Sequence, residues 1–196
     1  TTFTQTGWYE VQVQNSIGCI GRDSIYVVKK GNAPLVSFTA DNICKRDSPS
    51  FVNTSITDDG TTIVLSEWDF GDGQQLTPTS ALQGLKHLYD TSGMYRVSLH
   101  CVSSSGCEQD FSQMVTVYSL PEPEFSPIMA CKDASVSFQN YTRSEYRVNE
   151  YTWRFSEEDS SELIQPEYIF TDTGMHQVCL IAKNILGCFD SVIHTI

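Results

Sequence analysis

An internal repeat limits the fold of this chain more than any other feature of its sequence. Three segments align without gaps, each with an aromatic residue four positions before a glycine: residues 1–7, 87–93 and 168–174. Each glycine is followed by alternating apolar residues and then by a Gly-Cys pair, and the period is 81 to 88 residues. The 196 residues therefore hold the end of one unit and two further units in tandem.

The pattern inside each unit predicts β-structure. Apolar and polar residues alternate with period 2, β-branched residues are frequent, and turn residues recur every 8 to 12 positions. We therefore expect an all-β chain of antiparallel, immunoglobulin-like sandwiches arranged head to tail. The second unit should contain strands near 35–40, 50–56, 62–70, 84–89, 94–102 and 109–118, with a short one near 74–78. Its predicted core is Phe38, Phe51, Val64, Trp68, Phe70, Tyr89, Tyr95, Val97, Leu99, Val115 and Val117.

Prolines mark the boundaries between units. Pro34 and the segment Pro121-Glu122-Pro123 follow closely behind predicted strands, and proline ends a hydrogen-bonded ladder because it lacks a donor. These positions divide the chain into the C-terminal part of one unit (1–31), a complete unit (34–119) and a divergent unit (120–196). The linkers are short and contain no Gly/Ser tract, so we expect a jointed rod.

The hexapeptide Trp68-Asp69-Phe70-Gly71-Asp72-Gly73 is the most conspicuous motif. Two carboxylates between aromatics and glycines could form a metal loop, a catalytic dyad or a tight turn. The third unit reads Trp153-Arg154-Phe155-Ser156-Glu157-Glu158 at the same place, so the aromatics persist while the Asp/Gly loop does not. A core strand and its turn need only the aromatics, and we interpret the motif as a strand end followed by a turn. Asp69 points outward and can accept hydrogen bonds from the turn amides.

These residues closely resemble the polycystic kidney disease (PKD) domain. The resemblance rests on the hexapeptide, on His87-Leu88-Tyr89 and on the run from Gly93 through Tyr95 to Leu99, and it covers residues 34–119. The third unit keeps Trp153, Phe155 and Gly174 but lacks the FGDG loop and the histidine, so it looks like a divergent copy. The resemblance implies an extracellular β-sandwich that serves as a spacer or an interaction module, with His87 in a structural hydrogen bond. The added cysteines look like the repeats of very large surface proteins of the Bacteroidota, including gliding-motility adhesins exported by the type IX secretion system.

Charge and composition argue against several functions. Twelve basic and 24 acidic residues give a net charge of −12, which repels nucleic-acid phosphates. No apolar run is long enough to span a bilayer. The four histidines lack zinc-ligand spacing and no GxSxG motif occurs, so we expect no enzyme activity and no cofactor. A weakly bound surface calcium is the alternative at Asp58-Asp59 and at Glu157-Glu158-Asp159, where a solvated loop is the simpler interpretation.

The seven cysteines fall mainly into two repeated classes. Cys44 and Cys131 precede the second strand of their units, while Cys19, Cys107 and Cys188 open the last strand. The extras are Cys101, a predicted buried thiol, and Cys179. In a seven-stranded sandwich the two classes lie at opposite poles, about 20–25 Å apart, too far for a disulfide inside one unit. Head-to-tail packing would bring Cys44 to Cys188, and Cys107 to a cysteine of the first unit. The alternatives are a Cys44–Cys107 bond through a distorted loop, and free thiols.

Taken together, the sequence predicts a non-catalytic stalk segment of a large secreted, cell-surface adhesin or filament. Its expected partners are neighbouring repeats of the same chain, with polysaccharide or other surface proteins as further candidates through outward aromatics such as Trp8 and Tyr118. The alternative is a set of accessory polymer-binding modules on a secreted protease or glycoside hydrolase, which predicts a catalytic domain nearby in the full chain.

Overall fold

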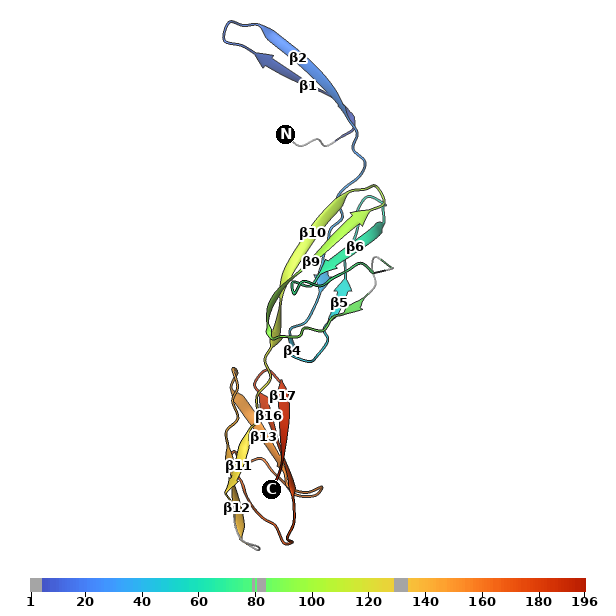
Figure 1. Ribbon diagram of the computed structural model, residues 1–196. Coiled ribbons are helices and arrows are strands. Elements are labelled where there is room, and N and C mark those ends of the chain that lie inside the picture. The colour runs from blue at the N-terminus through green and yellow to red at the C-terminus, as the bar shows by residue number, and fades with distance from the viewer. Residues whose placement is uncertain (1–4, 79, 81–83, 129–133) are drawn as a thin grey trace.

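The computed structural model describes residues 5–78, 80, 84–128 and 134–196. Within these ranges the chain is all-β and contains no helix, so no helix there could span a membrane. A hairpin and two sandwiches follow one another along one direction, and the molecule is elongated (Figure 1). The predicted fold class, a head-to-tail array of immunoglobulin-like sandwiches, is confirmed.

The N-terminal part of the described chain is a single hairpin. Strands β1 (Gly7–Gln14) and β2 (Ile20–Val27) pair antiparallel over eight residue pairs. Val11 and Val13 share one face, and they are 59% and 66% exposed. The equivalent residues of the second unit, Val97 and Leu99, are fully buried. The aligned segment 1–7 leads into this hairpin, and its residues 1–4 lie outside the described residues.

The second unit is a sandwich of two sheets. The larger has the strand order β4-β10-β9-β6-β7 and the smaller the order β3-β5-β8. Their bounds are β3 Phe38–Thr39, β4 Ile43–Cys44, β5 Ser50–Asn53, β6 Ile63–Asp69, β7 Gln75–Leu76, β8 Leu85–Lys86, β9 Gly93–Ser103 and β10 Glu108–Tyr118. The long hairpin β9–β10 pairs over ten residue pairs and forms the centre of the larger sheet.

Strand β4 was not expected from the sequence. It pairs parallel with the end of β10, through Val117↔Ile43 and Tyr118↔Cys44. A strand of two residues is too short to show an alternating pattern, which explains why the sequence did not reveal it. The pairing places Cys44 at the C-terminal end of the unit, as the sequence argument required.

Aromatic side chains dominate the core of the second unit. The ring of Trp68 meets Phe38 and Phe51 edge to face, at centroid distances of 5.0 and 5.8 Å. The buried residues are Phe38, Phe51, Trp68, Phe70, Leu85, Tyr89, Val97, Leu99, Cys101, Val115 and Val117, with Tyr95 partly buried against them. The prediction was wrong for Val64, which is 59% exposed. A register shift between Ile63 and Leu65 inserts Val64 as an extra residue, and such a bulge turns it away from the core.

The third unit repeats this arrangement with its own core. Its larger sheet has the order β14-β13-β16-β17 and its smaller sheet the order β11-β12-β15. The bounds are β11 Phe125–Ile128, β12 Ser135–Asn140, β13 Val148–Arg154, β14 Ser160–Ser161, β15 Glu167–Ile169, β16 Gln177–Asn184 and β17 Phe189–Thr195. The buried cluster is Phe125, Phe138, Trp153, Phe155, Val178 and Leu180, separate from the core of the second unit.

Candidate functional site

The hexapeptide occupies the end of β6 and the turn that follows. Trp68 and Phe70 are buried in the core, and their rings lie parallel at 6.3 Å. The amide of Gly71 donates to the carboxylate of Asp69 at 2.8 Å. A side chain at Gly71 would lie 2.6 Å from the carbonyl oxygen of Arg96, and its φ is +78°. The turn therefore requires glycine here for both conformation and space.

Asp72 does more than shape the turn, contrary to our sequence interpretation. Its carboxylate accepts the amide of Gln74 at 3.0 Å and lies 2.7 Å from Nε2 of His87. The imidazole of His87 stacks on Phe70 at 3.9 Å and is almost fully buried. Burial would raise the pKa of Asp72, but the hydrogen bonds from His87 and Gln74 outweigh it and hold the pKa below 3.8. The pair closes one end of the core. The structural hydrogen bond expected for His87 is therefore made with Asp72.

The third unit builds the same closure from different residues. Tyr168, aligned with His87, stacks on Phe155 at 4.4 Å. Its hydroxyl donates to the carboxylate of Asp159 at 2.6 Å. This hydrogen bond is the main cause of the raised pKa of Tyr168, and burial adds to it. Both units thus use an acidic residue to hold a ring over the core.

The acidic pair Asp58-Asp59 holds the linker between the hairpin and the second unit. Asp59 accepts the amide of Asn32 at 2.7 Å, and Asp58 accepts the side-chain amide of Asn32 at 3.0 Å. Hydrogen bonds from the Thr61 side chain and the Asn32 amide lower the pKa of Asp59 to about 2. These carboxylate oxygens are therefore engaged with the protein. Within the described ranges no three His, Cys, Asp or Glu side chains gather to hold a metal ion.

Three turns of the same geometry present a cysteine at one pole of each unit. In each turn the residue four positions before the cysteine accepts the cysteine amide through its side chain: Asn15 for Cys19, Ser103 for Cys107 and Asn184 for Cys188. Each has a glycine with positive φ directly before the cysteine, at +92°, +79° and +85°. The repeated Gly-Cys pairs of the sequence are thus one structural device used three times.

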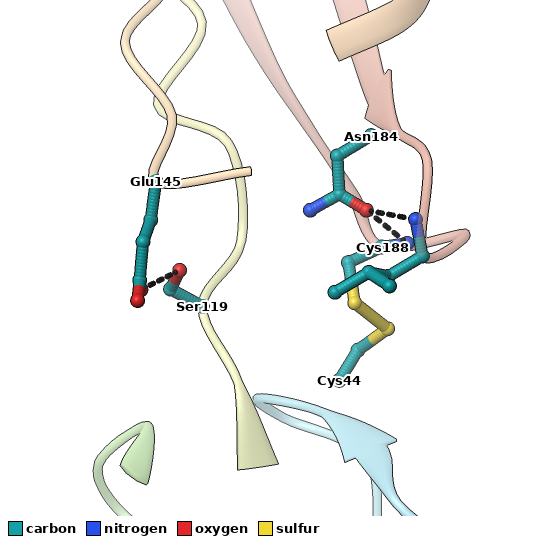
Figure 2. The surroundings of a disulfide bond; sticks show 6 residues. Cys44, Ser119, Glu145, Asn184 and Cys188 are labelled. Atoms are coloured by element: carbon teal, nitrogen blue, oxygen red, sulfur yellow. Dashed lines mark hydrogen bonds between the residues drawn. A yellow bond between two sulfur atoms is a disulfide. The ribbon is translucent and has the colours of Figure 1, made fainter. Parts of the chain in front are cut away.

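A disulfide joins the second unit to the third at one of these turns. Cys44 in β4 is bonded to Cys188 in the β16–β17 turn, with Cα atoms 5.4 Å apart (Figure 2). This is the pairing that the head-to-tail argument predicted, and the intra-unit alternative with Cys107 is wrong. The amide of Cys188 donates to Asn184, so the turn is fixed beside the bond (Figure 2). Because the bond spans two separate cores, it is a covalent staple between units.

Polar and aromatic contacts surround the staple. Arg46, two residues after Cys44, has the left-handed φ of +76° and places its guanidinium 2.8 Å from the carboxylate of Asp190. The hydroxyl of Ser119 donates to Glu145 at 2.7 Å (Figure 2). The ring of Tyr118 meets Tyr146 edge to face at 5.6 Å. Tyr118, predicted to point outward, is thus engaged at the junction rather than displayed.

The remaining cysteines have different surroundings. Cys19 is exposed and Cys107 half-buried, and both are free thiols in the part of the chain that is described. The partner expected for Cys107 is not in this sequence, and Cys131 lies outside the described residues. Cys101 is buried as predicted, and burial raises the pKa of its thiol. Cys179 is half-buried beside Arg154, and burial likewise raises its pKa.

Sequence reasoning located the staple but missed its surroundings. Arg46 and Glu145 carry no motif, because one depends on an unusual backbone angle and the other on the packing of a loop against the linker. The pairing of Asp72 with His87 was also missed, although both belong to the resemblance named above. The exposed Trp8 packs against the ring of Tyr26 across the hairpin, at a centroid distance of 5.3 Å.

Comparison with known proteins places the second unit in a family. Residues 31–118 match the PKD domain family. The PKD1 domain of Vibrio anguillarum Epp is 26% identical, with a TM-score of 0.38 over 44% of this chain and 95% of that one. The PKD1 domain of the Vibrio cholerae metalloprotease PrtV is 29% identical, with a TM-score of 0.39 over 44% of this chain and 98% of that one. A structure of carbohydrate-binding modules from the β-sandwich superfamily is 20% identical, with a TM-score of 0.42 over 77% of this chain and 59% of that one. No curated protein matches the chain.

Proposed function

We propose that this chain, whose residues 31–118 form a PKD domain, is a non-catalytic stalk segment of a large secreted adhesin or filament at the cell surface. Its units are 1–31, 34–119 and 120–196, and the third is a divergent copy of the second. The stalk holds a distal part of the protein away from the surface and transmits tension. Surface motility and export by the type IX system belong to the same proposal.

The disulfide between Cys44 and Cys188 is the observation that carries the proposal. A bond inside one unit stabilises that unit, whereas a bond between units fixes how they are joined. An accessory module that only tethers an enzyme to a polymer has no need of a fixed junction. Disulfides also persist mainly in oxidising compartments, which is consistent with an extracellular location.

Neighbouring repeats of the same chain are the proposed partners. The repeated Gly-Cys turns at Cys19 and Cys107 support this, because the third member of the class is already stapled to the preceding unit. Polysaccharide binding remains the rival proposal, in which the units serve a secreted protease or glycoside hydrolase. The full reading frame separates the two: the stalk requires many more repeats, and the rival requires a catalytic domain.

Labelling of intact cells tests the proposal directly. Antibodies raised against residues 34–196 should stain living, unpermeabilised cells of the source organism, and protein released from their surface should contain the Cys44–Cys188 peptide when mapped without reduction. Staining that appears only after permeabilisation, or free thiols at both cysteines in the native protein, would rule the stalk out.

A further inference from the structure

The staple changes the covalent route through the molecule. Cys44 and Cys188 are 144 positions apart in sequence, yet their Cα atoms lie 5.4 Å apart. A force that pulls the two ends of the chain apart can therefore pass from residue 44 to residue 188 through the bond. The residues between them form a closed loop, which cannot be stretched until the bond breaks.

The route through the second unit is short and already extended. Leu35 bridges to Ile56, Phe38 and Thr39 pair with β5, and Ile43 pairs with β10 beside Tyr118. The segment 34–44 thus passes from the linker side of the unit to the pole at which β10 ends (Figure 1). It crosses the unit once and carries only Phe38 of the aromatic core.

The route through the third unit is a single strand. Cys188 is followed at once by β17, which pairs with β16 over seven residue pairs. β17 runs from the pole that faces the second unit toward the opposite end, near the C-terminus (Figure 1). A β-strand is close to the maximum extension of a polypeptide, so tension along β17 gains almost no length.

We infer that tension along this molecule runs through residues 34–44, the Cys44–Cys188 bond and residues 188–196, and bypasses residues 45–187, which supply most of both sandwich cores. These two segments hold 20 residues. Fully stretched, they and the bond span about 65 Å, whereas residues 34–196 without the bond could reach about 550 Å. The staple therefore makes the two-unit rod nearly inextensible, whether or not its cores are folded.

This inference explains how the proposed stalk would resist stretching. Only its biological role rests on the proposed function. Cleavage of the bond by a dithiol transfers two electrons and two protons to the two sulfurs and oxidises the dithiol to its own disulfide. Each half of the rod then depends on its hydrogen bonds and core alone. The mechanical property belongs to the chain itself and can be measured without a ligand or a cell.

Single-molecule pulling tests the route. The full chain, with a handle fused at each end, is stretched in an optical trap before and after addition of dithiothreitol. The oxidised protein should show only the opening of the hairpin β1–β2, which lies outside the bridge. The reduced protein should add steps that together release about 480 Å of contour length as the two units unfold.

Two variants separate the bond from other effects of the reductant. Cys44→Ser should release the additional length without reductant, and Cys179→Ser, which removes a half-buried thiol outside the bridge, should behave as the wild type does. If Cys44→Ser fails to fold, wild type oxidised first and reduced in the trap gives the same comparison. Release of about 480 Å from the oxidised protein would overturn the inference. An inextensible chain that is absent from the cell surface would instead overturn the stalk alone.

Discussion

At the scale of single residues, the pairing of Asp72 with His87 links stability to pH. Hydrogen bonds hold the folded-state pKa of Asp72 below 3.8, its unfolded value, so the ionised carboxylate stabilises the second unit. This contribution is fully present above about pH 5, well above the unfolded pKa, and is lost as the pH falls through the lowered folded-state pKa. Asp72→Asn should therefore be less stable than wild type at pH 7, and the difference should shrink below pH 4.

Urea unfolding of both proteins between pH 2 and pH 7, followed by circular dichroism, checks this expectation. A difference that stays constant over the whole range would show that the charge of Asp72 is not involved. The same samples address the calcium alternative, because millimolar calcium should leave both melting temperatures unchanged. A calcium-dependent rise in wild type that Asp72→Asn abolishes would favour a metal loop.

Trp68 is the residue whose loss should cost most. It is 1% exposed and contacts three other aromatic rings, so Trp68→Ala should lower the free energy of unfolding by about 3–5 kcal/mol. That is a large part of the stability expected for a unit of this size. Trp8→Ala is the matched control, because Trp8 is 71% exposed and its removal should change stability by less than about 0.5 kcal/mol. Equal losses in the two variants would show that Trp68 is not the core anchor.

At the scale of elements, the turn after β6 shows two different reasons why a position requires glycine: backbone conformation and lack of space. Gly71 and Gly73 both have positive φ, but only Gly71 has neighbouring backbone within reach of an added side chain. Gly73→Ala should cost about 1–2 kcal/mol through conformation alone. Gly71→Ala should cost a further 1–3 kcal/mol or so, because Arg96 in β9 would have to move. Denaturant unfolding of the two variants compares these costs, and a Gly73→Ala protein as unstable as Gly71→Ala would contradict the explanation.

The elements also show what the sequence could and could not predict. Long strands with many alternating residues, such as β9 and β10, were predicted nearly to their ends because each residue adds to the pattern. β4 has two residues and no pattern, and the bulge at Val64 breaks the alternation that placed it in the core. Both misses come from local backbone geometry, which one-dimensional periodicity does not describe.

At the scale of the whole molecule, the staple was predictable because strand direction fixes which pole each cysteine occupies. That argument needed only the number of strands and the repeat offsets of Cys44 and Cys188. The contacts around the bond required more, since Arg46 reaches Asp190 from a left-handed backbone conformation. The sequence therefore predicted which cysteines pair across the junction, but not the polar contacts that surround the bond.

The separate cores lead to a last prediction, that the second unit folds without the third. Its buried cluster includes no residue beyond Val117, and among the described residues the junction adds partly exposed polar contacts and an aromatic pair. Exposed contacts of this kind are worth up to about 1 kcal/mol each. Residues 34–119 carrying Cys44→Ser should therefore unfold cooperatively, within about 3 kcal/mol of the same unit in the full-length Cys44→Ser chain. Residues 1–30 alone should give no dispersed NMR spectrum, because an isolated hairpin is marginal in water. A fragment 34–119 without a cooperative transition would mean that the junction, rather than the core, holds the unit together.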